Sequence, residues 1–421
     1  MGVPELLAPA GGMRQLLAAL RFGADAVYAG LDSGSLRARA TNFSPAGLQE
    51  AVRLTHAHGK KLYLALNILP FDGQMQGMLQ AARLALELGV DAAIVADAGL
   101  VALLRAETPD LELHLSTQAN TLNTQAALFW HAHGARRIIL ARELSLEQIA
   151  AMRRGLPATL ALEAFVHGAM CMSYSGRCLL SAALAGRSAN QGDCAQPCRW
   201  GYALVEEGEK RAPLPILEDE RGTAVLSAGD LCMIEHLPAL CAAGLAGLKI
   251  EGRMKSEYYV AVVVSAYRRA LDACAADPAA YRAGELPGLL RAELDKVSHR
   301  AYDTGFYFGP PVQPGGAEGY TQGAEYVGYV LERLPGGWGR VEVRNRFFVG
   351  DALEALTPRA IVPFSVARIR VEEGGEEVPV INRPLAVVHL PLPEGVGADD
   401  LLRGPCRNHV PLRDDVGPYP L

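Results

Sequence analysis

Short runs made almost wholly of apolar residues alternate, along the first part of the chain, with longer stretches whose apolar residues recur every three to four positions. The short runs are typical of strands buried on both faces, as in a parallel sheet covered by helices. The longer stretches are typical of amphipathic helices. We predict strands over residues 5–8, 25–30, 61–67, 91–96, 112–117, 137–141, 159–167 and 246–251, with helices such as 13–22, 45–58, 76–88 and 146–154 between most of them.

This alternation predicts an α/β fold of one particular kind. Eight strands, the last followed by a helical pattern over 256–275, fit a (β/α)8 TIM-like barrel. A doubly wound open sheet is the alternative, but the GxGxxG fingerprint of dinucleotide-binding sheets is missing after the first strand, where residues 8–12 read APAGG. We therefore expect a barrel whose active site lies at the carboxyl ends of its strands.

The pattern departs from this regularity in two places. A cysteine-containing insertion over 168–200 follows the seventh strand, and a hairpin-like region over 202–226 comes after it. Beyond about residue 285 the chain changes to short strands broken by turns such as Pro335-Gly-Gly337. We expect a barrel over 1–284 that contains the insertion, a connector over 285–325, and a small β-barrel-like domain over 326–421.

Composition and charge narrow the classes of function. The net charge of −6 argues against a broadly basic surface for nucleic acid, although a local patch is compatible with it. No signal peptide pattern opens the chain, and no apolar run approaches the ~20 residues of a membrane helix. We expect a cytoplasmic protein, where disulfides rarely persist, so its eight cysteines need another explanation.

Four of the eight cysteines gather in the insertion with the spacing C-x6-C-x15-C-x3-C. They are Cys171, Cys178, Cys194 and Cys198. Thiolates suit soft metals, so we predict that these four ligate one metal centre. Their spacing matches neither zinc ribbons nor ferredoxins, and it leaves an iron–sulfur cluster and zinc both open.

Charged residues also stand on the strands that border this insertion. Lys249, Glu251 and Arg253 alternate along the last strand, so their side chains point to one face, where they are candidates for catalysis or for binding an anion. A structural ion-pair network is the alternative. Glu163 and His167 occupy the same face of the seventh strand and are further catalytic candidates.

Polar residues follow several other strands and are candidates for substrate binding, since the carboxyl ends of barrel strands converge. They are Asn67, Asp97, Gln118, Asn120, Arg142 and Glu143, with Arg37 and Arg39 as candidate phosphate contacts. Tyr174 and Arg177, between the cysteines, can cover a metal centre or approach a substrate base.

Several motifs resemble the signature of the peptidase U32 family, the so-called collagenase-like proteases. The matching stretches are FVHGAMCMSYSGRCLL at 165–180, NQGDCAQPCRW at 190–200 and LKIEGR at 248–253. Further matches are ELLAPAG at 5–11, GADAVYAG at 23–30, STQAN at 116–120, ARELS at 141–145 and FVGD at 348–351. The family often has Asn-Ser-Lys-Asp-Leu where this chain has Ser227-Ala-Gly-Asp-Leu231, so its lysine is absent here.

Within the family, the chain looks most like the branch implicated in hydroxylating the wobble uridine of tRNA. The resemblance implies a [4Fe–4S] cluster, prephenate as co-substrate and tRNA as partner; relatives act on a ribosomal RNA cytidine or in ubiquinone synthesis. The resemblance also implies that quinone-pathway relatives draw one ligand from near this position, which makes Cys232 a reserve ligand here.

Two other functions stay open at this point. A peptidase would need an activated nucleophile or water, and neither HExxH nor GxSxG occurs in the chain. A non-catalytic electron-transfer partner is the third possibility, because a cluster with four cysteine ligands has no open iron site.

Overall fold

The computed structural model describes residues 2–31, 42–171, 173–174, 176–200, 203–204, 214–215, 229–309 and 320–407. Arg37, Arg39, Ser227 and most of the hairpin predicted over 202–226 lie outside these ranges. The two described pieces of that hairpin, β8 (Ala203–Leu204) and β9 (Leu214–Pro215), pair antiparallel.

The predicted barrel is confirmed. Its eight parallel strands close on themselves, because the last strand pairs with both the first and the seventh. The strands are β1 (Glu5–Pro9), β2 (Ala26–Ala29), β3 (Lys61–Leu66), β4 (Ala92–Val95), β5 (Leu113–Leu115), β6 (Ala135–Ile139), β7 (Ala161–Ala169) and β11 (Gly247–Ile250). Nearly every residue of these strands is buried, as the apolar runs predict.

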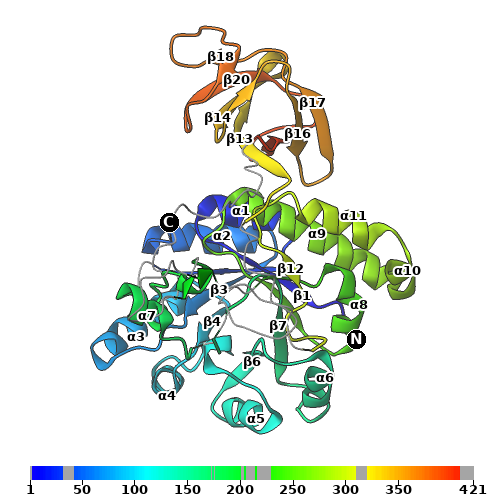
Figure 1. The fold of residues 1–421 in the computed structure, drawn as a ribbon. Helices are drawn as coiled ribbons and strands as arrows, with labels where there is room; N and C mark the ends of the chain where they lie inside the picture. Colours follow the sequence, from blue (N-terminus) through cyan, green and yellow to red (C-terminus); the bar gives the residue numbers. More distant parts are fainter. Residues whose placement is uncertain are drawn as a thin grey trace.

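Helices surround the strands in the way that the longer periodic stretches predict (Figure 1). They are α1 (Met13–Arg21), α2 (Pro45–Ala57), α3 (Asp72–Glu87), α4 (Ala98–Glu107), α5 (Thr124–Ala132), α6 (Leu146–Arg154), α8 (Leu237–Ala242) and α9 (Glu257–Ala276). Two more, α10 (Pro278–Ala283) and α11 (Leu286–Leu294), pack against α9. None of the helices in the described ranges is both long and apolar enough to cross a membrane.

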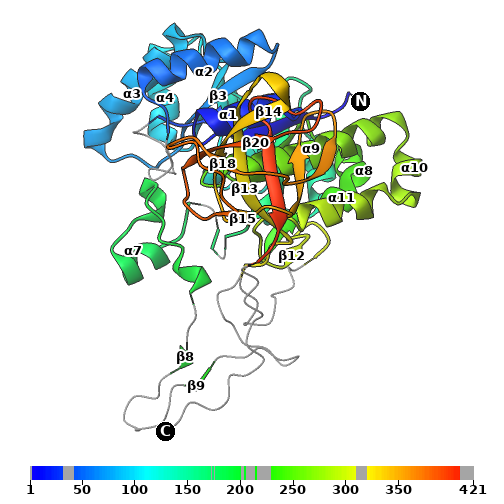
Figure 2. The same ribbon diagram turned by 90° about the horizontal axis from the view of Figure 1, so that it is seen from above.

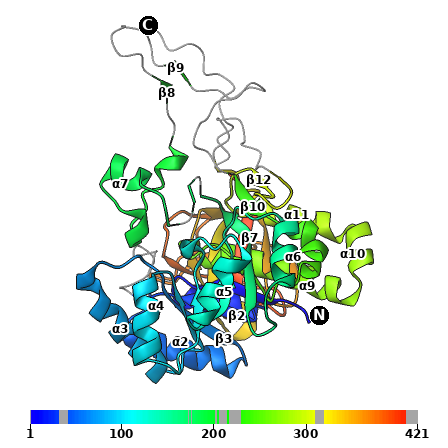
Figure 3. The same ribbon diagram turned by 90° about the horizontal axis from the view of Figure 1, so that it is seen from below.

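Two short strands extend the sheet at the carboxyl end of β7. β10 (Asp230–Cys232) runs antiparallel to the last residues of β7, and β12 (Tyr302–Asp303) pairs with β10. The cysteine insertion leaves the barrel between β7 and β10. It carries α7 (Leu180–Ala185) and the 3-10 turns η2 (Ala189–Gln191) and η3 (Pro197–Arg199). In all three views α7 lies on the side of α3, away from α10 (Figures 1, 2 and 3).

The predicted all-β region at the carboxyl end is also confirmed. Its seven-stranded antiparallel sheet comprises β13 (Ala324–Arg333), β14 (Trp338–Val343), β16 (Ala352–Leu356), β17 (Ile361–Ser365), β18 (Arg370–Val371), β20 (Val387–Pro391) and β21 (Leu401–Pro405). A separate pair joins β15 (Phe347–Phe348) to β19 (Val380–Ile381). Valine, leucine and isoleucine side chains on the inner face give this region a hydrophobic core of its own.

Ion pairs hold the β region against the barrel helices α1, α9 and α11. Arg14 of α1 donates to Glu342 at 2.6 Å, and Arg344 donates to Glu257 of α9 at 2.6 Å. Arg403, 1% exposed, pairs with Glu293 of α11. The β region therefore covers the side of the barrel formed by these three helices (Figure 1), and it leaves the carboxyl ends of the strands to form a site.

Candidate active site

The carboxyl ends of the barrel strands and the cysteine insertion enclose a cavity of about 130 Å³. An ordered water needs only roughly 10–15 Å³ of such space, so the cavity can take an organic ring. Residues from six of the eight barrel strands contribute to its wall, among them Tyr28, Ala65, Ile94, Ile139, Phe165 and Lys249. The active site expected at this end of the barrel is thus a real cavity.

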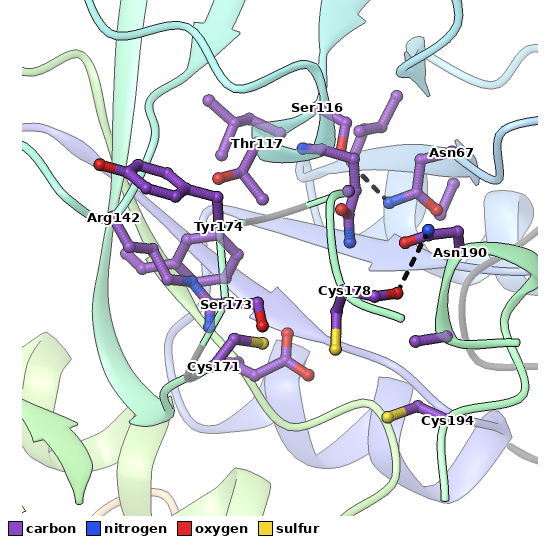
Figure 4. Close-up of a pocket in the computed structure, with 18 of the residues that line it drawn as sticks. Asn67, Ser116, Thr117, Arg142, Cys171, Ser173, Tyr174, Cys178, Asn190 and Cys194 are labelled. Atoms are coloured by element: carbon purple, nitrogen blue, oxygen red, sulfur yellow. Dashed lines mark hydrogen bonds between the residues drawn. The ribbon is translucent and has the colours of Figure 1, made fainter. Parts of the chain in front are cut away.

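All four cysteines of the insertion line this cavity. None forms a disulfide: Cys171 is exposed, and Cys178, Cys194 and Cys198 are half-buried. Figure 4 shows Cys171, Cys178 and Cys194 on one side of the pocket, across from Asn67, Ser116 and Thr117.

Short hydrogen-bonded turns hold the cysteine segments. The amide of Gln196 donates to Sγ of Cys194 at 3.3 Å, and Asn190 donates through Nδ2 to the carbonyl of Cys178 at 3.4 Å. The amide of Ala195 donates to Oγ of Ser181 in α7 at 2.8 Å. These contacts fix the backbone beside the cavity-lining thiols; that the four thiols ligate one metal centre stays a prediction.

The donor set suits a soft metal centre, since four unbridged thiols line one cavity. Among the described residues, no three His, Cys, Asp or Glu side chains lie close enough together to hold a metal ion. The four cysteines therefore line one pocket, but their side chains are not arranged around a common metal position.

Lys249 of β11 lines the same cavity, together with Glu251 and Arg253, which follow the end of this strand; their roles in catalysis or anion binding stay predictions. Arg253 is 3% exposed and donates to Oδ1 of Asn42 at 3.0 Å. Nζ of Lys249 lies 4.0 Å from the centre of the Tyr28 ring. With Arg142, three basic side chains line the described wall of the cavity, together with the carboxylate of Glu251.

Glu163 does not line the cavity but lies beneath it, fully buried inside the barrel. Arg137 donates to its Oε2 at 2.8 Å, and Nζ of Lys249 lies 3.6 Å from its Oε1. Burial alone would raise the pKa of Glu163, but the charges of Lys249 and Arg137 outweigh it and hold this pKa below its ordinary value. The carboxylate thus belongs to a structural ion-pair network that positions Lys249.

The prediction that His167 shares a face with Glu163 is wrong, because a β-bulge interrupts β7. Lys249 pairs with Phe165 but the next residue, Ile250, pairs with His167, so the register skips Val166 and reverses the side chains after it. Gly168 follows at φ +103°, and a Cβ there would lie 2.5 Å from the carbonyl oxygen of Glu251. Only glycine allows β7 and β11 to approach so closely.

His167 consequently points away from the cavity, into a buried cluster of tyrosines. Its ring lies 5.5 Å from the Tyr267 ring and 5.3 Å from the Tyr302 ring. Burial lowers the pKa of His167 to about 3, so the side chain stays neutral at physiological pH. His167 therefore packs as a structural histidine, and its position does not support the catalytic role for which it was a candidate.

Cys232, the reserve ligand, lies beside this histidine and not beside the other cysteines. It pairs with His167 across β10 and β7, is 5% exposed, and does not line the cavity. Burial raises the pKa of its thiol to about 11. Such a thiol packs as a small apolar side chain, so the structure gives no support to its reserve role.

Three of the predicted substrate-binding residues do meet in the cavity: Asn67, Gln118 and Arg142. Asn67 donates through Nδ2 to Oγ of Ser116 at 3.3 Å. Arg142 stacks 4.0 Å above the Phe165 ring and donates to the carbonyl of Ala169 at 2.8 Å.

The other predicted residues at strand ends have local roles outside the cavity lining. Asp97 caps α4 by accepting from the amide of Leu100 at 2.8 Å. Asn120 adopts φ 55° and ends the 3-10 turn η1 (Thr117–Ala119). Glu143 is half-buried, and burial raises its pKa. The expectation that these three contact substrate is therefore not supported.

Sequence reasoning missed several residues of the cavity wall, among them Tyr28, Ser116, Ser173 and Asn190. Tyr28 looks like an ordinary core aromatic, because it stands in the middle of an apolar strand. Asn190 lies within the motif at 190–200, and that motif was the one available signal for it.

Known proteins resemble this chain along most of its length. A protein named tRNA hydroxylation protein P from Escherichia coli is 36% identical over 93% of this chain and 94% of its own. An uncharacterized protease of Methanocaldococcus jannaschii is 41% identical over 73% of this chain and 74% of its own. The 23S rRNA 5-hydroxycytidine C2501 synthase of Escherichia coli is 33% identical over 88% of this chain and 55% of its own.

Two family descriptions match consecutive parts of the chain. Residues 322–403 match the peptidase family U32 C-terminal domain. Residues 11–315, which contain the cysteine insertion and every barrel strand except β1, match peptidase family U32. The resemblance carried by the cysteine motifs is thereby confirmed, and the chain belongs to peptidase family U32.

Proposed function

We propose that this chain is an enzyme that hydroxylates RNA, converting the wobble uridine of tRNA to 5-hydroxyuridine. The observation that carries the proposal is the cavity at the strand ends, where four thiols face a polar wall beside buried cations. The names of the relatives support it, since those from Escherichia coli are a tRNA hydroxylation protein and an rRNA hydroxycytidine synthase. Because tRNA is the partner, we also propose a cytoplasmic location.

Cys171, Cys178, Cys194 and Cys198 would hold a [4Fe–4S] cluster in this site, with zinc as the alternative metal. Such a cluster bound by four thiolates carries net negative charge, and Lys249, Arg253 and Arg142 on the same cavity wall offset it. The cluster would supply electron transfer. Binding it would draw the half-buried cysteine segments closer together than they stand here.

The same cations suit a small anionic co-substrate, for which prephenate is our candidate. Arg253 is held in place by Asn42, and Arg142 by the carbonyl of Ala169 and the ring of Phe165. Guanidinium groups fixed in this way bind carboxylates with little further loss of conformational freedom. Their role in this chain is to orient the anion and to neutralise its charge.

The family name also raises proteolysis as a second function, but the cavity does not favour it. Two serines line the described wall, Ser116 and Ser173, but neither a histidine nor an aspartate lines it with them. His167, the one histidine of the neighbouring strand, points the other way. The described wall therefore lacks the serine–histidine pair with which a serine peptidase activates its nucleophile.

The proposal is tested by deleting the gene and analysing the nucleosides of purified tRNA and ribosomal RNA by mass spectrometry. We expect 5-hydroxyuridine and nucleosides derived from it to disappear from tRNA, with hydroxylated cytidine in 23S ribosomal RNA unchanged. Loss from ribosomal RNA alone would assign a different substrate. Unchanged nucleosides in both fractions would refute the proposal.

A further inference from the structure

One buried acceptor in the cavity has no partner. Oε1 of Gln118 is inaccessible to solvent and accepts no hydrogen bond from any described residue. Turning the amide over would put its nitrogen at this place, still without a partner. A buried polar group without a partner costs free energy, so in a site it marks a position where a ligand completes the bonding.

The backbone holds Gln118 firmly in this position. Ser116 caps the turn η1 by accepting from the amide of Gln118 at 3.3 Å, and Thr117 donates to the carbonyl of Leu140 at 2.9 Å. Gly176, between Cys171 and Cys178 in the chain, packs over both oxygens of this residue: a Cβ there would lie 2.4 Å from the carbonyl oxygen of Gln118 and 3.2 Å from its Oε1. The turn that carries the amide is thus fixed to the cysteine segment.

The wall around Gln118 is polar and lies across from the cysteines. Asn67 and Ser116, joined by a hydrogen bond, line the cavity beside it, and Figure 4 shows them opposite Cys171 and Cys194. A carboxamide offers one acceptor and one donor side by side, so it can bind two adjacent edge atoms of a flat base. This wall therefore has the chemistry that reads a base edge.

Tyr174 supplies an aromatic face at the same cavity. Tyr174 is 52% exposed although it lines the cavity, and it stands between Cys171 and Cys178 in the chain. Proteins that read single-stranded RNA place unstacked bases on exposed aromatic rings of this kind. Packing alone poorly explains an exposed tyrosine beside this cavity.

We propose that Gln118 reads the O2 and N3–H edge of a uridine taken out of its stack, with the base lying against Tyr174. This inference rests on the proposed RNA hydroxylation and names its specificity-determining residues. Rotation of the side chain brings the amide oxygen from beneath Gly176 into the cavity, where it accepts from N3–H, and the amide nitrogen donates to O2. Because C5 lies across the ring from C2, this pose turns C5 toward the cysteine side. Cytosine presents two acceptors at O2 and N3, so one amide cannot bind both.

The test measures how tightly the full-length protein, purified without oxygen, binds a fluorescent anticodon stem-loop. Four probes share one sequence and carry uridine, cytidine, 3-methyluridine or an abasic site at the wobble position. We expect uridine to bind about 10- to 100-fold more tightly than cytidine or 3-methyluridine, as bidentate base contacts do elsewhere. Gln118→Leu, of similar size, should bind uridine only as well as cytidine.

Matched variants separate base reading from damage to the fold. Gln80→Ala, at an exposed position of α3, should keep the preference for uridine. Tyr174→Ala should weaken the binding of every probe that has a base by about 10-fold, because the stack is lost, and should leave the binding of the abasic probe unchanged. Tyr174→Phe, which keeps an aromatic ring, should bind the probes as the wild type does. Melting temperatures close to that of the wild type are required of each variant.

Equal binding of all four probes by the wild type would overturn the inference, as would a uridine preference that survives in Gln118→Leu. This outcome is distinguishable from failure of the proposed function. Gene deletion would still remove 5-hydroxyuridine from tRNA if only the assignment of Gln118 were wrong.

Discussion

A chain carrying Cys171→Ala is expected to come through anaerobic purification colourless, whereas the wild type should be brown. Four thiols of the insertion line one cavity without forming disulfides. A [4Fe–4S] cluster uses all four, so removing one leaves an iron atom without its ligand. Iron and sulfide should fall from about four of each per chain to below about one.

The matched control is Cys406→Ala, which removes a half-buried cysteine after the last strand of the β region. This variant should keep its colour and its iron. A colourless wild-type protein with stoichiometric zinc would show that the site holds zinc and not a cluster. Full iron content in the Cys171→Ala protein would show that Cys171 is not a ligand.

Glu163→Ala is expected to lower the free energy of unfolding by about 3–5 kcal/mol at neutral pH, the usual result of removing one partner from a buried ion pair. Glu163 is fully buried and touches both Arg137 and Lys249, so its loss leaves two cations inside the barrel with less compensation. Urea denaturation of the two proteins measures the difference. Glu50→Ala, in an exposed pair with Arg53, should change stability little.

The deficit of Glu163→Ala should also depend on pH in a defined direction. The pKa of Glu163 is lowered in the folded protein, so its contribution is present above the ordinary glutamate pKa and is lost as pH falls through the folded value. Burial lowers the pKa of Lys249, and Glu163 opposes this shift. Without Glu163, the pKa of Lys249 in the folded protein falls further below its ordinary value. Unfolding of the variant then takes up more protons at this lysine, so its free energy of unfolding rises with pH up to the ordinary lysine range.

The difference in free energy of unfolding between the wild type and Glu163→Ala is therefore expected to be largest near neutral pH and to shrink toward both acid and alkaline pH. A deficit that stays constant from acid to alkaline pH would show that Glu163 acts through packing and not through its charge.

The barrel could be predicted because its signal is strong and local. Strands buried on both faces must be apolar throughout, and helices must carry a periodic stripe, so the eight strands are visible in the pattern. A strand period of two predicted one face for Lys249, Glu251 and Arg253, and all three line the cavity, although β11 ends at Ile250 and the last two follow it. The four cysteines stood out because they cluster within one insertion.

What failed depended on geometry that the pattern does not encode. The bulge at Val166 reverses His167, and no residue type at that position announces it; only Gly168, with its positive φ, is a partial sign. The strands β10 and β12 are too short to show a period, and they bury Cys232 beside His167. Asp97 and Asn120 end strands as substrate residues do, but caps and turns need the same side chains.

The most direct measurement of the account is the 5-hydroxyuridine content of tRNA in a deletion strain that carries either the wild-type gene or the Cys171→Ala gene. Mass spectrometry of digested tRNA gives this content, with immunoblots to show equal protein levels. The account predicts that the wild-type gene restores the nucleoside and that the Cys171→Ala gene does not. Restoration by both genes, or by neither, would contradict the claim that the cysteine pocket of this chain hydroxylates tRNA.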